Sequence, residues 1–270
     1  MSAKSLSKNA TKNQVTPASL QRWNKYLAIL YAVQGLVVLI LSVARMYPVT
    51  TNFLGLDTLQ TQAQGHTAFA AGTHHLFDVS LVWVVAIFLF MTAIAHGLAA
   101  SKLRGAYEKD IKKGINRIRW IEYAFSASTM LVAIALLSAT YDVSSLLMIW
   151  VLSAAANLLW LLAEVQSQKA RKPNWLTFAF GCAAGIVPWI VLGIYFLSAH
   201  VYGSGVPSFV HWVYLSLFVL FAAVPANMYL QYRKVGNWTN YLYTERTYMI
   251  ISLVAKTALA WQIFAGVLHP

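Results

Sequence analysis

The sequence predicts an all-α membrane protein with seven transmembrane helices, and three observations support this fold. Of the 270 residues, 59% are hydrophobic and only 10% are charged, whereas a soluble domain has roughly 25% charged residues. Seven apolar runs approach the roughly 20 residues that a helix needs to cross a bilayer. Basic residues gather in alternate loops between these runs. We therefore expect one seven-helix domain over residues 1–270.

The expected spans follow the apolar runs in order. They lie at residues 26–45, 76–100, 119–140, 144–165, 175–199, 208–231 and 247–268. Residues 1–21 are predicted to be a polar cytoplasmic tail, because they are too polar and too long to be a signal peptide. Residues 46–74 form the longest extracellular loop, and its pattern predicts a short β-hairpin.

The distribution of Lys and Arg predicts the orientation in the membrane. Every Lys and Arg except Arg45 and Lys256 falls in the N-terminal tail or in loops on one side of the predicted bundle. Such residues concentrate on the cytoplasmic side of membrane proteins. We therefore expect a multi-pass cell-membrane protein with its N-terminus cytoplasmic and its C-terminus extracellular. The net charge of +12 then needs no nucleic-acid partner.

Lys256 lies in the middle of the apolar run SLVAKTALAWQIFAG. An unpaired ammonium at this depth costs several kcal/mol, and the lysine is too far from either end of the run to reach the interface. Glu122, early in the third span, is the expected partner. The two residues form either an ion pair that fixes packing or a functional site. A lysine kept from water attacks aldehydes and forms Schiff bases.

Polar residues recur four positions apart around this pair, so each couple shares a helix face. The couples are Ser252 with Lys256, Glu122 with Ser126, and Thr92 with His96. The hydroxyl groups could join one polar network with the Lys–Glu pair. A lone histidine in a membrane helix often serves packing only. Next to this pair, His96 is equally well interpreted as a proton acceptor.

A long conjugated aldehyde would need aromatic walls. The later spans supply Trp189, Phe218, Phe221 and Trp261. An aromatic stripe is more often helix packing than a cofactor pocket, so these residues alone identify no ligand. The neighbouring His74 and His75 lack an acidic cluster, and no metal site is expected. No HExxH, CxxC, GxSxG or P-loop motif occurs, and we expect no enzyme activity.

The chain resembles the heliorhodopsin family. The similarity is carried by SLVAKTALAWQIF, RWIEYAFSAS, FGCAAGIVPW and YLQYRKVGNWTNYLYTERTY, and it covers most of residues 20–268. The resemblance implies all-trans retinal on Lys256 as a protonated Schiff base, with Glu122 as the counter-ion and Ser252 and Ser126 nearby. It also implies a light-sensing homodimer with a slow photocycle, which signals without pumping ions.

The resemblance also assigns a proton network. His96 matches the second-helix histidine of the family's polar cluster, with Thr92 in place of the usual serine. Where the family commonly has a first-helix histidine, this chain has Tyr31. Half of the usual histidine pair is therefore replaced.

Two alternatives to a photoreceptor remain at this point: light-gated or light-driven proton transport, and a transporter without a chromophore. A pump needs a proton donor and an acceptor on opposite sides of the site. Apart from Glu122, the acids near the spans are Glu164 and Asp78, both close to interfaces, which argues against an efficient pump.

For a sensor, the cytoplasmic loop 102–119 is the expected contact for a partner protein. Its basic face fits anionic membrane lipids equally well.

Overall fold

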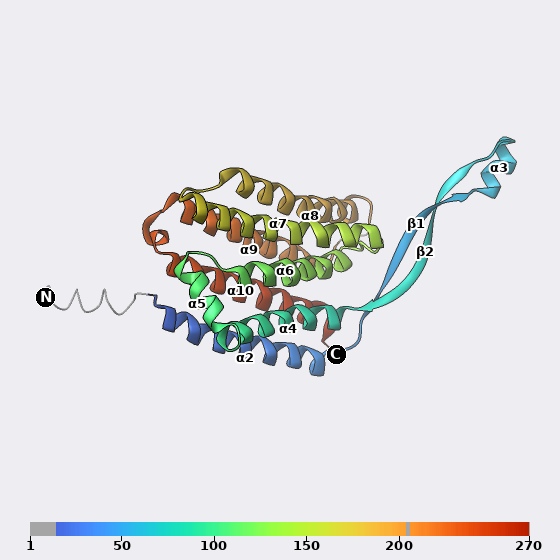
Figure 1. The fold of residues 1–270 in the computed structure, drawn as a ribbon. Coiled ribbons are helices and arrows are strands. Elements are labelled where there is room, and N and C mark those ends of the chain that lie inside the picture. The colour runs from blue at the N-terminus through green and yellow to red at the C-terminus, as the bar shows by residue number, and fades with distance from the viewer. Residues whose placement is uncertain (1–14, 204–205, 270) are drawn as a thin grey trace, which may run out of the picture.

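The computed structural model describes residues 15–203 and 206–269, so residues 1–14 of the predicted tail lie outside the described residues. Seven helices of the described chain are long and apolar enough to cross a membrane, which confirms the predicted fold. They lie side by side in one bundle (Figure 1). These helices are α2 (Pro17–Leu41), α4 (Leu81–Ala100), α6 (Arg117–Leu137), α7 (Val143–Ala170), α8 (Trp175–Val201), α9 (Ser208–Arg233) and α10 (Tyr241–Ile263), which continues as a short π-helical turn over Phe264–Leu268.

Helices that follow one another in the chain pack together around the bundle. Helix α4 lies between α2 and α6, α7 lies between α6 and α8, and α10 joins α9 to α2. The backbones of α8 and α9 approach each other at few points by comparison. Here the ring of Trp189 in α8 contacts Tyr214, Phe218 and Phe221 in α9. The wall between α8 and α9 is therefore built mainly from aromatic side chains.

Capping residues set the helix starts, and the apolar runs do not reveal them. Thr16 and Ser19 form a reciprocal capping box, and Pro17 occupies the first turn, so α2 begins well before residue 26. Residues 17–21 are therefore helix and not tail. Asn240 caps α10 by accepting the Leu242 N–H with its side-chain oxygen. The last helix consequently begins at Tyr241 and not at residue 247.

The predicted extracellular loop, residues 46–74, ends too early. Strand β1 (Met46–Leu56) pairs antiparallel with β2 (Phe69–Ser80), and α3 (Thr58–Gln64) connects them. This hairpin projects far from the bundle (Figure 1). Because β2 continues to Ser80, α4 begins after it and not at residue 76, and Asp78 lies in a strand. The Thr50 N–H donates to the carbonyl of Tyr141 at 2.9 Å and ties the root of the hairpin to the α6–α7 connection.

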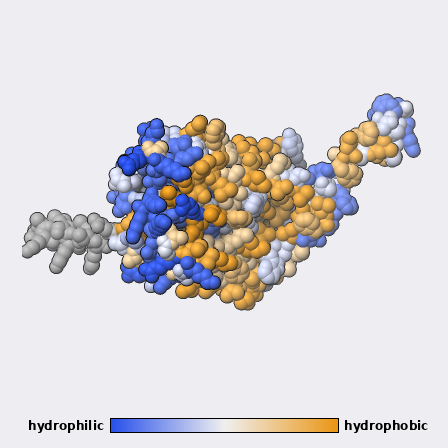
Figure 2. Space-filling model, viewed as in Figure 1, coloured by the Kyte–Doolittle hydropathy of each residue, from blue (hydrophilic) through white to orange (hydrophobic). Residues whose placement is uncertain are grey.

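The loop predicted over residues 102–119 contains a helix of its own. Helix α5 (Arg104–Lys112) lies across the end of the bundle at which α2 begins, while the C-terminus lies at the opposite, hairpin end (Figure 1). Figure 2 shows hydrophilic side chains gathered at the α5 end and a hydrophobic flank beside them. A short 3₁₀ turn over Gly236–Thr239 connects α9 to α10. The apolar flank and the polar α5 end are what a bilayer-spanning bundle requires.

Candidate functional site

Lys256 and Glu122 meet inside the bundle. Lys256 lies midway along α10 and is 2% exposed, and Glu122 lies in the second turn of α6 and is 8% exposed. The distance between Lys256 Nζ and Glu122 Oε1 is 2.5 Å. A charge buried without a partner is strongly destabilising. Each of these two residues therefore compensates the charge of the other. The pair is also the place where a cation on the lysine nitrogen would be stabilised.

Glu122 is held from a second side by α4. The Thr92 hydroxyl lies 2.6 Å from Glu122 Oε1 and donates to it. Ser126 lies one turn farther along α6 and is fully buried, but its hydroxyl has no hydrogen-bond partner among the described residues. The carboxylate oxygen that binds Lys256 therefore receives a hydroxyl hydrogen bond as well. This arrangement fixes the position of the negative charge.

Aromatic rings flank the lysine nitrogen. It lies 5.0 Å from the ring centre of Tyr123 and 5.8 Å from that of Tyr31. The Tyr31 hydroxyl oxygen lies 3.5 Å from Ser252 Oγ. Rings placed in this way stabilise a cation through their negative faces. Tyr31 and Ser252 were predicted members of this site, whereas Tyr123 was not predicted, although it directly follows Glu122.

His96 lies behind Tyr31, at the side of the ion pair nearer the α5 end. Its ring stacks on Tyr31 with centres 5.9 Å apart. His96 Nδ1 lies 2.7 Å from Asn24 Oδ1. This contact joins α4 to α2 beside the ion pair. Tyr31 therefore contacts the one histidine of the predicted pair that this chain retains.

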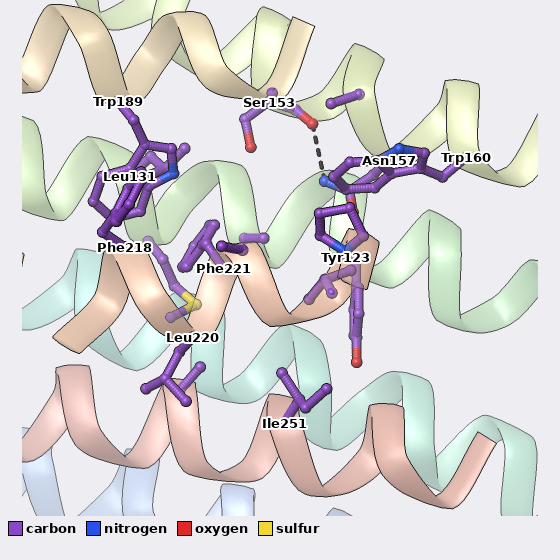
Figure 3. Close-up of a pocket in the computed structure, with 18 of the residues that line it drawn as sticks. Tyr123, Leu131, Ser153, Asn157, Trp160, Trp189, Phe218, Leu220, Phe221 and Ile251 are labelled. Atoms are coloured by element: carbon purple, nitrogen blue, oxygen red, sulfur yellow. Dashed lines mark hydrogen bonds between the residues drawn. The ribbon is translucent and has the colours of Figure 1, made fainter. Parts of the chain in front are cut away.

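An aromatic cavity of about 490 Å³ begins at Lys256 and extends toward α7, α8 and α9. Figure 3 shows Trp189, Phe218 and Phe221 around it, with Tyr123 near one end. The only hydrogen bond drawn among its labelled residues joins Asn157 to the carbonyl of Ser153 (Figure 3). Both the volume and the apolar lining are typical of a pocket for a small hydrophobic ligand.

Trp261, also predicted for this wall, does not line the cavity. Its side chain is 36% exposed and packs edge-on against Phe264. Trp261 follows Lys256 by five positions, which places it about 140° around a helix. The seventh helix therefore directs this tryptophan away from the lysine.

The cavity reaches the outer surface of the bundle between α8 and α9. Its lining includes Ile186, which is 42% exposed, and Phe218, which is 36% exposed. These side chains belong to the hydrophobic flank and not to the polar ends. An apolar ligand in the bilayer is therefore separated from the cavity by side chains and not by backbone.

A second buried ionic cluster, which was not predicted from the sequence, lies nearer the α5 end. Arg119 forms ion pairs with Glu164 and with Glu245. The side chains of all three are at most 5% exposed. Arg119 was expected in a basic loop and Glu164 at an interface, and Glu245 was not considered. Arg119 and Glu164 lie at the ends of predicted apolar runs, and Glu245 lies just before the last run.

The arginine of this cluster is also enclosed by rings. Its guanidinium carbon lies 3.9 Å from the ring centre of Tyr248 and 4.5 Å from that of Trp120. Arg119 is therefore part of the bundle interior, although it is one residue of a strongly basic sequence segment. The asparagine cap at Asn116 and the aromatic neighbours were the available sequence signals.

Comparison with known protein families gives one match. The heliorhodopsin profile matches residues 20–268, nearly the whole chain. A comparison with curated proteins finds no match. Together with its seven membrane-spanning helices, this match makes the chain a member of the heliorhodopsin family, which consists of retinal-binding, rhodopsin-like light-sensing membrane proteins.

Proposed function

We propose that the protein is a photoreceptor that holds all-trans retinal on Lys256 as a protonated Schiff base, with Glu122 as the counter-ion. The observation that carries this proposal is the 2.5 Å contact between the two residues at the end of the aromatic cavity. When bound, the chromophore absorbs visible light and changes its isomer. The alternative is an ion pair that serves packing alone.

The residues of the site fit such a ligand. The primary amine of Lys256 suits an aldehyde, and the Glu122 carboxylate compensates the positive charge that the resulting bond carries. The Thr92 hydroxyl orients that carboxylate. Trp189, Phe218 and Phe221 supply apolar walls for a conjugated chain. A packing pair would need no adjoining cavity of about 490 Å³.

An absorption experiment tests the attachment. Protein expressed with all-trans retinal is purified, and its visible spectrum is recorded before and after hydroxylamine treatment in the light. We expect a visible band that bleaches, and we expect Lys256→Ala to lack it, whereas Lys25→Ala retains it as the matched control. A band that survives washing in Lys256→Ala would place the attachment elsewhere. No band in the wild type would leave Lys256 and Glu122 as a packing pair.

We further propose that the protein signals by a change of shape and does not pump ions. Its N-terminus would be cytoplasmic, so that residues 102–119 with α5 face a cytoplasmic partner protein or anionic lipids. A homodimer is the proposed assembly. Photocurrents in voltage-clamped cells test the signalling proposal. We expect none, and a sustained current that follows the proton gradient would replace the sensor with proton transport.

A further inference from the structure

A small second cavity lies between the Lys256–Glu122 pair and the inner cluster formed by Arg119, Glu164 and Glu245. Its volume is about 30 Å³, and both Glu122 and Glu245 line it. A buried site needs roughly 10–15 Å³ to hold one water molecule, so about two fit here. The other lining residues are Asn24, Ala95, His96, Ala99, Tyr107, Asn116, Ile118, Arg119, Tyr123 and Met249. The cavity is therefore a polar space between two buried charged sites.

The lining contains polar atoms that the protein itself does not satisfy. Among the described residues, Asn24 Nδ2, Tyr107 Oη and Arg119 Nε have no hydrogen-bond partner. An unpaired buried polar group costs about 1–3 kcal/mol, and water in a polar cavity removes this cost. Tyr107 lies in α5, outside the spanning helices, and burial raises the pKa of its phenol far above the usual value. Its hydroxyl therefore stays neutral and can both donate and accept.

The two charged sites differ in net charge. Lys256 and Glu122 balance each other. In the inner cluster, one guanidinium faces two carboxylates, Glu164 and Glu245. With both carboxylates ionised, the inner cluster carries one excess negative charge. A proton released near Glu122 is therefore attracted toward the inner cluster.

The two inner carboxylates differ in how many donors they already have. Glu164 accepts from the Asn116 backbone N–H at 3.0 Å, the Trp120 indole N–H at 2.8 Å and the Tyr241 hydroxyl at 3.2 Å, in addition to Arg119. Among the described residues, Glu245 accepts only from the Asn116 side-chain amide and Arg119. Donors stabilise the ionised form of a carboxylate. Glu245 is also the one that lines the cavity.

We propose that Glu245 accepts the proton that leaves the Lys256 nitrogen after illumination, through water held in the small cavity. An N–H bond at Lys256 breaks and an O–H bond forms at Glu245, while the intervening water exchanges protons without net change. No electron is transferred, and the proton returns in the dark. The proposal rests on the proposed function, because it needs a protonated nitrogen at Lys256 and a photoreaction.

The groups that face Glu245 come from several helices. Arg119, Glu164, Tyr107 and His96 approach from other elements, and Tyr241 and Tyr248 belong to α10 itself. Glu164 is the only other carboxylate bound to Arg119 in the described chain. Glu164→Gln is therefore the matched control. Each variant leaves Arg119 with one carboxylate, so neither leaves an unpaired charge.

Infrared difference spectroscopy after a light flash tests the proposal. We expect the C=O stretch of a newly protonated carboxylic acid in the wild type and in Glu164→Gln, and its loss in Glu245→Gln. A signal that persists in Glu245→Gln, or one that disappears only in Glu164→Gln, would overturn the assignment. A wild type without a visible band would contradict the proposed function instead, so the two failures are distinguishable.

A further variant keeps the test independent of Glu245→Gln. Ala99→Leu fills the cavity with apolar volume and leaves every ionic contact in place, and we expect it to abolish the same signal. A signal that persists in Ala99→Leu would contradict the route through the small cavity.

Discussion

The two buried cations among the described residues pair with different numbers of carboxylates. Lys256 has one, Glu122, and Arg119 has two, Glu164 and Glu245. A lysine offers a compact charge, whereas a guanidinium presents several donors in a plane and readily bridges two acids. The residue types thus match the geometry at each site. Both sites use α6, which supplies Glu122 and Arg119 less than one turn apart.

We predict that Glu122→Gln shifts the visible band to longer wavelength. The anion that stabilises the ground state of the charged chromophore is removed, while the amide keeps nearly the same volume. The absorption maximum of the protonated form is the measurement. Glu108→Gln, in the solvent-accessible pair with Arg104, serves as the control and should leave the band in place. An unmoved band in Glu122→Gln would show that another group is the counter-ion.

Removing Arg119 should destabilise the protein strongly. Arg119→Gln leaves two buried carboxylates with no cation, and breaking a buried ionic group costs about 3–5 kcal/mol. Arg117→Gln breaks the pair with Asp110, in which the arginine side chain is 52% exposed, and such a pair is worth about 0–1 kcal/mol. Thermal unfolding in detergent compares the two. Equal losses would contradict the structural role given to Arg119.

At the scale of single residues, isolated buried charged residues were easier to predict from the sequence than clustered ones. Lys256 and Glu122 were predicted because each interrupts an apolar run. Arg119 and Glu245 were missed because basic and polar neighbours surround them, so they resemble loop residues. Trp261 was predicted for the aromatic wall from its residue type alone, although its spacing of five positions from Lys256 places it on another face of α10.

At the scale of elements, small residues determine how closely α7 and α8 approach. A Cβ added at Gly181 in α8 would lie 2.5 Å from Nε1 of Trp160 in α7. Trp160 also lines the large cavity. The α7–α8 contact thus couples helix packing to the shape of the ligand pocket. The sequence showed GCAAG only as a common small-residue motif, because nothing in it identifies the opposing tryptophan.

Gly181→Ala should therefore lower both stability and retinal uptake. Overpacking of a close contact costs about 1–3 kcal/mol, and the displaced indole narrows the pocket. Gly97→Ala in α4 is the matched control, because its Cβ would meet only Ala28, at 3.9 Å. Alanine favours helix by up to about 1 kcal/mol over glycine, so the control should be neutral or slightly stabilised. Melting temperature and the yield of the visible band measure both effects.

The boundaries of elements were predictable only where composition changes sharply. The spans 175–199 and 208–231 match α8 and α9 closely, because polar connections flank both apolar runs. The boundary between β2 and α4 was misplaced because LFDVSLVW is apolar on both sides of it. The same apolar residues suit either a strand or a membrane helix there. The pairing with β1 decides between the two structures.

On the scale of the whole molecule, the bundle has two unlike ends. The α5 end is hydrophilic, and the other carries the hairpin and the C-terminus (Figures 1 and 2). The sequence predicted this asymmetry from its basic residues alone, although α5 itself was taken for a loop. Short amphipathic helices at a membrane surface escape detection because their apolar face is narrow.

Cysteine labelling in intact cells will establish the orientation. The chain has one cysteine, Cys182, so Cys182→Ala gives a background without thiols. We predict that His74→Cys, in the hairpin, reacts with a membrane-impermeant maleimide in intact cells. Lys113→Cys, between α5 and α6, should react only after lysis. The reverse pattern would place the N-terminus outside.

The contact between Lys256 and Glu122 has a consequence for how light sensitivity would be acquired. Because the two charges compensate each other within the polypeptide itself, this pair needs no pigment to neutralise it. Folding and binding of the pigment can then be separate events. The pigment can enter from the lipid between α8 and α9. A cell could keep a dormant pool of this protein and set its sensitivity by controlling the synthesis of the pigment.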